Sequence, residues 1–135
     1  MLLLDTMIVS ELRKSRPNAN VVRWLSKQAE DEIYLSVVTL GEIERGIEKC
    51  RKTDPEFATV LSAWTESLVR HYSDRILPVT TQIACRWGRL SAQMGHENAD
   101  LLLAATALTH KLTVVTRNTD DFAPTGVRLI NPFER

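Results

Sequence analysis

The chain has 135 residues, of which 44% are hydrophobic and 25% charged, as in an ordinary globular protein, and this length fits a single domain over residues 1–135. Lysine plus arginine number 17, as do aspartate plus glutamate, so the zero net charge argues against a general nucleic-acid coat. No apolar run reaches the ~18 residues of a membrane span, and Cys50 and Cys85 suggest reduced thiols, so we expect a cytoplasmic protein without membrane contact.

The first part of the chain predicts alternating strands and helices. An apolar strand over residues 1–5 precedes a helix over residues 6–14, which a proline-containing break at residues 15–18 ends. A second helix is predicted over residues 19–30. The alternating apolar positions that follow predict a strand over residues 32–38.

The remaining elements continue this alternation. Thr39 and Glu42 match the T-x-x-E capping box, which predicts a helix over residues 39–52. Asp54 and Pro55 are typical of the cap and first position of the next helix. Further elements are predicted in chain order: an edge or terminal strand over residues 75–79, helices over 80–94 and 98–110, and strands over 112–116 and 127–130. Such alternation predicts an α/β fold, with a mostly parallel sheet and helices on both faces.

Acidic residues stand where the predicted strands give way to helices. Asp5 ends the first strand, Glu42 follows the second, Asp100 opens a helix, and Asp120 and Asp121 follow a later strand. Such positions can share one rim of a parallel sheet, where α/β folds place their sites. Gathered carboxylates repel each other unless a cation lies among them, and oxygen ligands suit Mg²⁺ or Mn²⁺ rather than zinc. The pattern indicates metal-dependent phosphodiester chemistry.

Each acid also has a simpler structural explanation. Asp5 and Asp100 suit helix starts, and Glu42 suits the returning glutamate of a capping box. Asp100, however, shares a helix face with Ala104 and Ala107, which should turn its carboxylate towards the sheet. The acids taken together therefore favour a site over a set of independent caps.

The order of the motifs carries a resemblance to a known family. The motifs are Leu4-Asp5-Thr6, Thr39-Leu40-Gly41-Glu42-Ile43, Ala99-Asp100, and Thr116-Arg117-Asn118 with Asp121-Phe122. Together they resemble a PIN-domain ribonuclease, and most closely a VapC-type toxin of the FitB-like branch. The resemblance implies a PIN-like three-layer fold. It also implies a Mg²⁺- or Mn²⁺-dependent endoribonuclease that cleaves RNA by metal-activated water and is the toxin of a type II toxin–antitoxin system.

The resemblance also implies roles for individual residues. It assigns three acids to the metal and two hydroxyls to the support of the acids and the attacking water: Asp5, Glu42 and Asp100, and Thr6 and Thr116. The fourth acidic position of the family is occupied here by Asn118. Asn118 supplies an oxygen without charge, so either Asn118 or the nearby Asp121 would complete the metal site.

The expected partners follow from the same resemblance. They are an RNA substrate, a cognate VapB-like antitoxin, and a second copy of the chain in a homodimer, a heterotetramer or a larger complex. DNA would be contacted only through the antitoxin. Arg45 and Arg117 are the candidate RNA-binding residues, and Arg13, Lys14 and Arg16 form another basic cluster. The three tryptophans are expected in the core or at an interface.

Three alternatives share parts of the pattern. A haloacid-dehalogenase-like phosphatase also begins with a strand that ends in Asp, but it needs a second Asp where Met7 stands. A receiver-type signalling domain needs an Asp at the end of a later strand, and none is found there. A non-catalytic, partner-binding α/β domain would use the acids only as helix caps.

Overall fold

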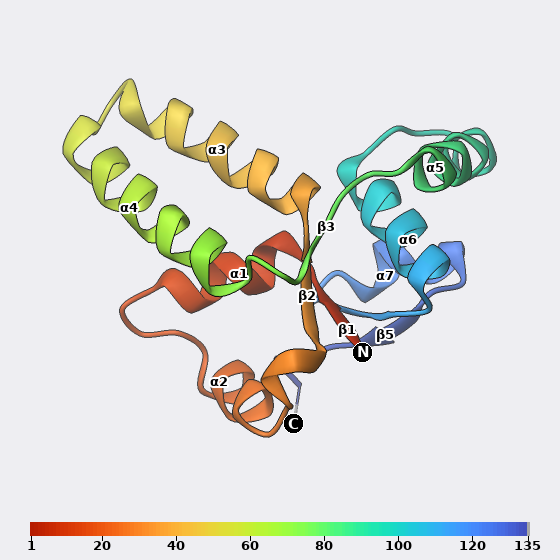
Figure 1. The fold of residues 1–135 in the computed structure, drawn as a ribbon, viewed down its shortest axis with the longest axis horizontal. Coiled ribbons are helices and arrows are strands. Elements are labelled where there is room, and N and C mark those ends of the chain that lie inside the picture. Colours follow the sequence, from red (N-terminus) through yellow and green to blue (C-terminus); the bar gives the residue numbers. More distant parts are fainter. Residues whose placement is uncertain (135) are drawn as a thin grey trace.

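A five-stranded parallel sheet forms the centre of the molecule, shown in Figure 1; the structure is a computed structural model and describes residues 1–134. The strand order is β3-β2-β1-β4-β5. The strands are β1 (Leu2–Leu4), β2 (Ile33–Ser36), β3 (Ile76–Leu77), β4 (Thr113–Val115) and β5 (Arg128–Ile130). Every pairing between neighbouring strands is parallel, which confirms the predicted α/β class.

The order of the strands reverses between β1 and β4. From β1 the chain builds outward through β2 to β3, then crosses to the other side of β1 to add β4 and β5. Leu4 is in register with Val115, and the Asp5 N–H donates to the Val115 carbonyl at 2.9 Å. Asp5 and Thr116 therefore emerge side by side at the carboxyl ends of the two strands, where open α/β sheets bind their ligands.

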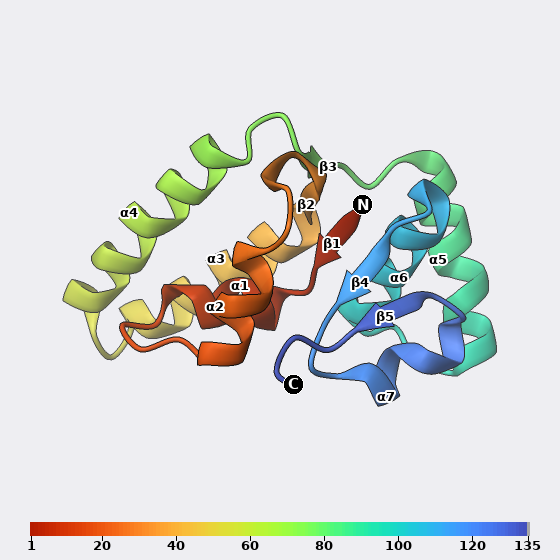
Figure 2. The same cartoon turned by 90° about the horizontal axis from the view of Figure 1, so that it is seen from below.

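Helices cover both faces of the sheet, as Figure 2 shows. Successive side chains of a strand point to opposite faces. Leu3 therefore joins a core cluster with α5 (Thr81–Met94), α6 (Ala99–His110) and α7 (Thr119–Phe122). Leu2 and Leu4 join a second cluster with α1 (Thr6–Arg13) and α2 (Ala19–Ser26). These two cores confirm the predicted three-layer arrangement.

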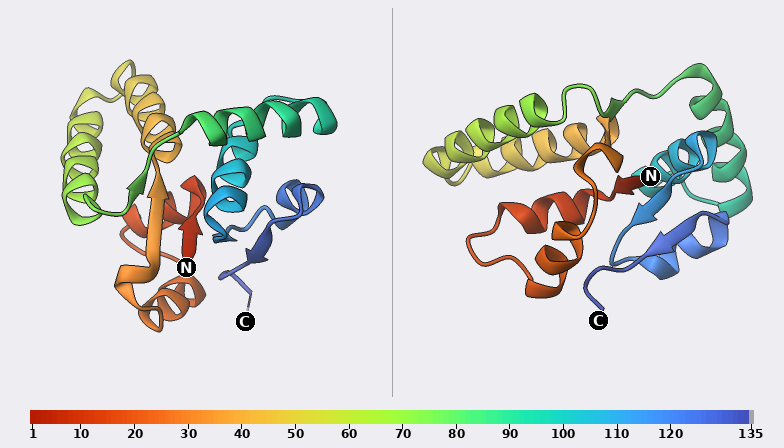
Figure 3. Two further views of the ribbon diagram at one scale, coloured as in Figure 1. Left: turned by 45° about the vertical axis from the view of Figure 1, so that its right-hand side comes forward. Right: turned by 60° about the horizontal axis from the view of Figure 1, so that its bottom comes forward.

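The helices α3 (Val37–Arg51) and α4 (Pro55–His71) form a hairpin that extends away from the sheet, as the views in Figure 3 show. The Asp54 side chain accepts from the Phe57 N–H at 3.1 Å and Pro55 opens the helix, so the predicted start of α4 is confirmed. Trp64 and Leu68 of α4 pack against the second core cluster. The hairpin is thereby joined to the sheet at its base.

The predicted capping box at Thr39 and Glu42 is wrong. Helix α3 begins two residues earlier at Val37, and the Ser36 hydroxyl caps it by accepting from the Val38 N–H at 3.0 Å. Thr39 is therefore a fully buried residue inside the first turn. The β-branched pair Val37-Val38 favoured a strand, but this local preference is weak and tertiary packing overrides it. Glu42 is consequently free for another partner.

Other differences concern short elements. The helix predicted over residues 19–30 ends at Ser26, and Glu30–Glu32 forms a separate 3₁₀ turn. The acidic stretch after β4, for which no helix was predicted, forms the short helix α7 and a 3₁₀ turn at Ala123–Thr125. Elements of three or four residues are too short to show a helical period. β3 lies at the sheet edge, as Pro78 indicated.

No helix within residues 1–134 combines the length and the apolar character that a bilayer span requires.

Candidate active site

Asp5 links the two central strands at their carboxyl ends. Its side chain is only 4% exposed. One carboxylate oxygen, Oδ1, accepts from the Thr6 N–H at 2.7 Å, and the other, Oδ2, accepts from the Thr116 hydroxyl at 2.7 Å. The first contact caps α1, but the second joins the end of β1 to the end of β4. Asp5 is therefore more than a helix cap.

Glu42 is brought to the same place by a hydroxyl of α1. The Thr6 hydroxyl donates to Glu42 Oε1 at 2.6 Å, and the Thr39 hydroxyl lies 3.1 Å from that of Thr6. Thr39 and Glu42 are three residues apart in α3 and so share one helix face. Sequence reasoning assigned Thr39 only to a cap. Its spacing from Glu42 was the signal that both could face the site.

Asp100 and Asp121 approach the site from the other side. Asp100 stands half-buried in the first turn of α6, and Asp121 belongs to α7. Burial raises the pKa of Asp100 most, and the negative charges of Glu42 and Asp121 raise it further, while His96 acts in the opposite direction. These effects place Glu42 and Asp121 within electrostatic reach of Asp100.

Burial and neighbouring carboxylates also raise the pKa of Asp5, as they do for Asp100. Burial raises the pKa of Asp5 from 3.8 to about 6 against the lowering effect of its hydrogen bond from Thr116. The charges of Asp100 and Glu42 raise it as well. Four acids from separate segments of the chain thus form what we call the acidic rim: Asp5, Glu42, Asp100 and Asp121. A cation placed among them would relieve this repulsion.

The acidic rim offers oxygen ligands only, which suits Mg²⁺ or Mn²⁺. Among residues 1–134, however, no three acidic, histidine or cysteine side chains stand close enough to chelate one ion directly. Mg²⁺ keeps several of its waters and is commonly bound through one or two carboxylates. The residues therefore fit a hydrated ion better than a fully dehydrated one.

Asn118 lies next to the rim through its backbone. Its N–H donates to the Thr116 hydroxyl oxygen at 2.9 Å, and that hydroxyl in turn donates to Asp5. Asn118 also precedes α7, whose first turn carries Asp121. The sequence left the fourth ligand open between these two residues. The structure gives Asn118 a backbone role in orienting Thr116, and it gives Asp121 an electrostatic effect on Asp100.

The two candidate RNA-binding arginines have different surroundings. The guanidinium of Arg117 lies over the Phe133 ring at 4.8 Å. Its charge also contributes to lowering the pKa of Glu11, whose largest cause is the hydrogen bond from Lys14. Arg45 is exposed on α3. Within residues 1–134 neither arginine forms an ion pair with the acidic rim.

A parallel α/β sheet with carboxylates gathered at its topological switch point defines a class of ligand-binding domains rather than one activity. The comparison with protein families narrows the class. The PIN domain matches residues 2–126, so this chain belongs to the PIN domain family. This membership confirms the predicted family and removes the phosphatase and receiver-domain alternatives.

Individual relatives extend along almost the entire chain. Toxin FitB of Neisseria gonorrhoeae is 34% identical, with 98% of this chain and 99% of the relative covered. A protein named VapC ribonuclease, from Sinorhizobium fredii, is 31% identical, with 99% of both covered. A solved structure of FitAB bound to a DNA fragment superposes with a TM-score of 0.87 at 33% identity, covering 100% of this chain and 97% of the other. The predicted likeness to VapC- and FitB-type proteins is confirmed.

Proposed function

We propose that this protein is the toxin of a type II toxin–antitoxin system and acts as a divalent-metal-dependent endoribonuclease. The observation that carries the proposal is the acidic rim, in which Asp5 is buried beside two other acids and has its pKa raised to about 6. Buried like charges are an unfavourable arrangement unless a ligand compensates for them, and such groups cluster at functional sites. The names of the relatives, toxin and ribonuclease, support the same activity.

In this proposal Asp5, Glu42 and Asp100 would hold a hydrated Mg²⁺ or Mn²⁺, in part through its bound waters, with Asp121 as the fourth acid. A divalent ion bound there supplies activation of a water and stabilisation of charge on the leaving oxygen. Thr116 and Thr6 hold the carboxylates of Asp5 and Glu42 in place by hydrogen bonds of 2.7 and 2.6 Å. The scissile phosphodiester is cleaved to leave a 3′-hydroxyl and a 5′-phosphate.

The proposed partners fit the charge of the rim. A cognate antitoxin would silence the enzyme by covering the four acids, and a basic side chain is the chemistry that complements them. Because the chain has zero net charge, we assign DNA contact to the antitoxin, in line with the solved FitAB complex on DNA. We further propose a cytoplasmic homodimer that assembles with the antitoxin into a heterotetramer or larger complex.

The test is cleavage of RNA in Mn²⁺, with and without EDTA. We expect Asp5→Asn and Asp100→Asn to lower the cleavage rate at least about 100-fold, the size of effect seen when a charge-stabilising group is removed from an active site. Asp74→Asn is the matched control, because Asp74 is an acid with 83% of its side chain exposed that pairs with Arg75 outside the rim. Full activity of both rim variants, or cleavage that survives EDTA, would overturn the assignment.

A further inference from the structure

A cavity of about 260 Å³ adjoins the acidic rim and is lined by residues of α1, α3 and α4. Its lining combines two residues of the site with polar, apolar and aromatic groups, among them Thr6, Ser10, Arg13, Glu42, Gly46 and Trp64. Thr6 and Glu42 belong to both places, since the bond between them holds Glu42 at the rim. Whatever occupies the cavity is therefore next to whatever binds the acids.

The size of the cavity suits a flat ring system. A cavity of about 150 Å³ in another protein is large enough to hold benzene. The space here, about 260 Å³, is sufficient for a fused pair of rings. Trp64 supplies an aromatic wall, and unpaired bases of RNA are commonly bound by stacking on aromatic or arginine planes together with hydrogen bonds to their edges.

The charge at the cavity also suits a nucleotide. Arg13 lines it with its guanidinium over the Phe57 ring at 5.7 Å, and within residues 1–134 it forms no ion pair with an acid. A free cation beside the rim can attract the phosphate backbone that the acids themselves repel. Ser10 adds a hydroxyl that can donate to or accept from a base edge.

We propose that this cavity binds a nucleobase of the RNA strand, a purine by its size, immediately next to the phosphate that is cut. The proposal rests on the proposed nuclease function and deepens it by adding a base preference. A base held in the cavity would position the adjacent scissile phosphate at the acidic rim. A basic or aromatic side chain of a protein partner is the competing occupant, and the experiment below separates the two.

Gly46 lines the cavity and is a position where a side chain can be added without changing an acid. A Cβ built on Gly46 meets no atom within 4 Å, so Gly46→Leu adds a bulky side chain at the cavity lining without a clash at its Cβ. Gly88 in α5 is the matched control, because its Cβ also meets nothing within 4 Å and it lies outside this cavity. Both changes replace a helical glycine and should raise the melting temperature rather than prevent folding.

The first measurement compares RNA oligonucleotides that carry adenosine, cytidine or an abasic ribose beside the cut bond. For the wild type and Gly88→Leu we expect kcat/KM to fall roughly 5- to 150-fold from adenosine to abasic, the range of one stacked base. Gly46→Leu should cleave all three alike, and Gly46→Ala should be intermediate. Equal cleavage of the three substrates by the wild type would overturn the base pocket while leaving the nuclease assignment intact.

The second measurement needs no catalysis. In EDTA, saturation-transfer NMR should detect adenosine bound to the wild type and to Gly88→Leu, at least about 5-fold more tightly than cytidine, and Gly46→Leu should abolish it. This result would hold even for a protein without nuclease activity, so the two proposals can fail separately. Absence of adenosine binding to the wild type would overturn the base pocket and favour a protein side chain as the occupant of the cavity.

Discussion

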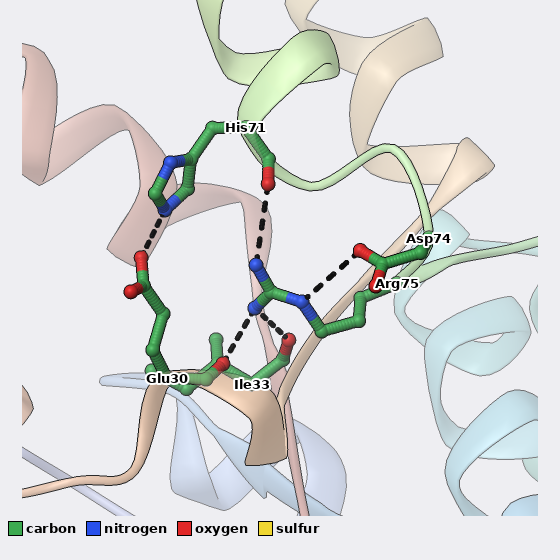
Figure 4. Close-up of polar contacts among 5 residues, drawn as sticks. All are labelled: Glu30, Ile33, His71, Asp74 and Arg75. Atoms are coloured by element: carbon green, nitrogen blue, oxygen red, sulfur yellow. Dashed lines mark hydrogen bonds and ion pairs between the residues drawn. The ribbon is translucent and has the colours of Figure 1, made fainter.

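Two polar clusters lie at opposite ends of the sheet, and they differ in how their charges are matched. At the amino end of β2, shown in Figure 4, Arg75 donates to the carbonyls of Glu30 and Ile33 at 2.5 and 2.9 Å and to that of His71 at 3.2 Å. Its Nε faces Asp74 at 3.5 Å, and His71 pairs with Glu30. Here one cation meets acceptors on every side.

The acidic rim, at the carboxyl ends, has the opposite character. Asp5 and Glu42 accept hydrogen bonds from threonine hydroxyls, and Asp100 is half-buried. Within residues 1–134 no lysine or arginine forms an ion pair with any of the three. Matched donors and acceptors are what a structural network requires. Charges left unmatched at the cost of stability indicate a ligand site. The contrast supports a structural role for the Arg75 cluster and the proposed ligand-binding role for the rim.

The largest effect on stability is expected at Arg75. Its side chain is 11% exposed, so Arg75→Ala leaves three carbonyls without their charged donor and should lower the free energy of unfolding by about 3 kcal/mol. Urea denaturation measures this change, and Arg75→Lys, which cannot bridge all three carbonyls, should fall between. If the rim binds Mn²⁺, the ion should raise the melting temperature of the wild type, and this rise should persist in both Arg75 variants. A loss below about 0.5 kcal/mol would mean that the cluster is an ordinary surface contact.

The pH dependence of the free energy of unfolding should reveal the cost of ionising Asp5 at the rim. The pKa of Asp5 rises from 3.8 to about 6 on folding, chiefly through burial, so the folded state holds this proton more tightly than the unfolded chain does. Stability from this group is therefore present below pH ~4 and is lost as pH rises through ~6, by up to about 3 kcal/mol at 1.36 kcal/mol per unit.

Asp5→Asn isolates this contribution, because asparagine does not titrate. In EDTA, the difference in unfolding free energy between the wild type and Asp5→Asn should shift in favour of the variant between pH 4.5 and 7.5. Mn²⁺ binds the ionised carboxylate, so its stabilisation of the wild type should grow over the same interval. A difference that does not change with pH would show that Asp5 is ionised without cost and would remove the contrast with Arg75.

The sequence predicted the rim better than it predicted the Arg75 cluster, for a physical reason. Asp5 follows an apolar strand and Asp100 opens a helix, and both features are visible in the sequence. A parallel sheet brings such positions together at the edge formed by the carboxyl ends of its strands. Arg75, by contrast, donates to backbone carbonyls of a segment more than 40 residues away. Every residue has a backbone carbonyl, so the sequence cannot indicate which carbonyls a side chain will bind. The bond from Thr6 to Glu42 was likewise hidden, because it depends on where α3 begins.

Asp100→Asn should separate stability from function at the rim. Removing this charge relieves its repulsion with Glu42 and Asp121, so the metal-free protein should gain about 0.5–1 kcal/mol, the usual scale of partly exposed charge interactions. The same variant should lose most of the Mn²⁺-induced rise in melting temperature. Thermal melts in EDTA and in Mn²⁺ measure both effects. A variant less stable than the wild type in EDTA would mean that Asp100 serves as a helix-start acid and not as part of a repelling cluster.

The smallest effect distinguishes the two candidates for the fourth position. Asp121 acts on Asp100 by charge, so Asp121→Asn should weaken Mn²⁺ binding about 10-fold, as the loss of a residue that supports metal ligands does. Asn118 reaches Thr116 through its backbone N–H, a bond that Asn118→Ala retains, so that variant should change Mn²⁺ affinity less than about 3-fold. Isothermal titration with Mn²⁺ compares them. The reverse order would place the Asn118 side chain, and not Asp121, at the metal, because only a direct ligand would then account for the loss.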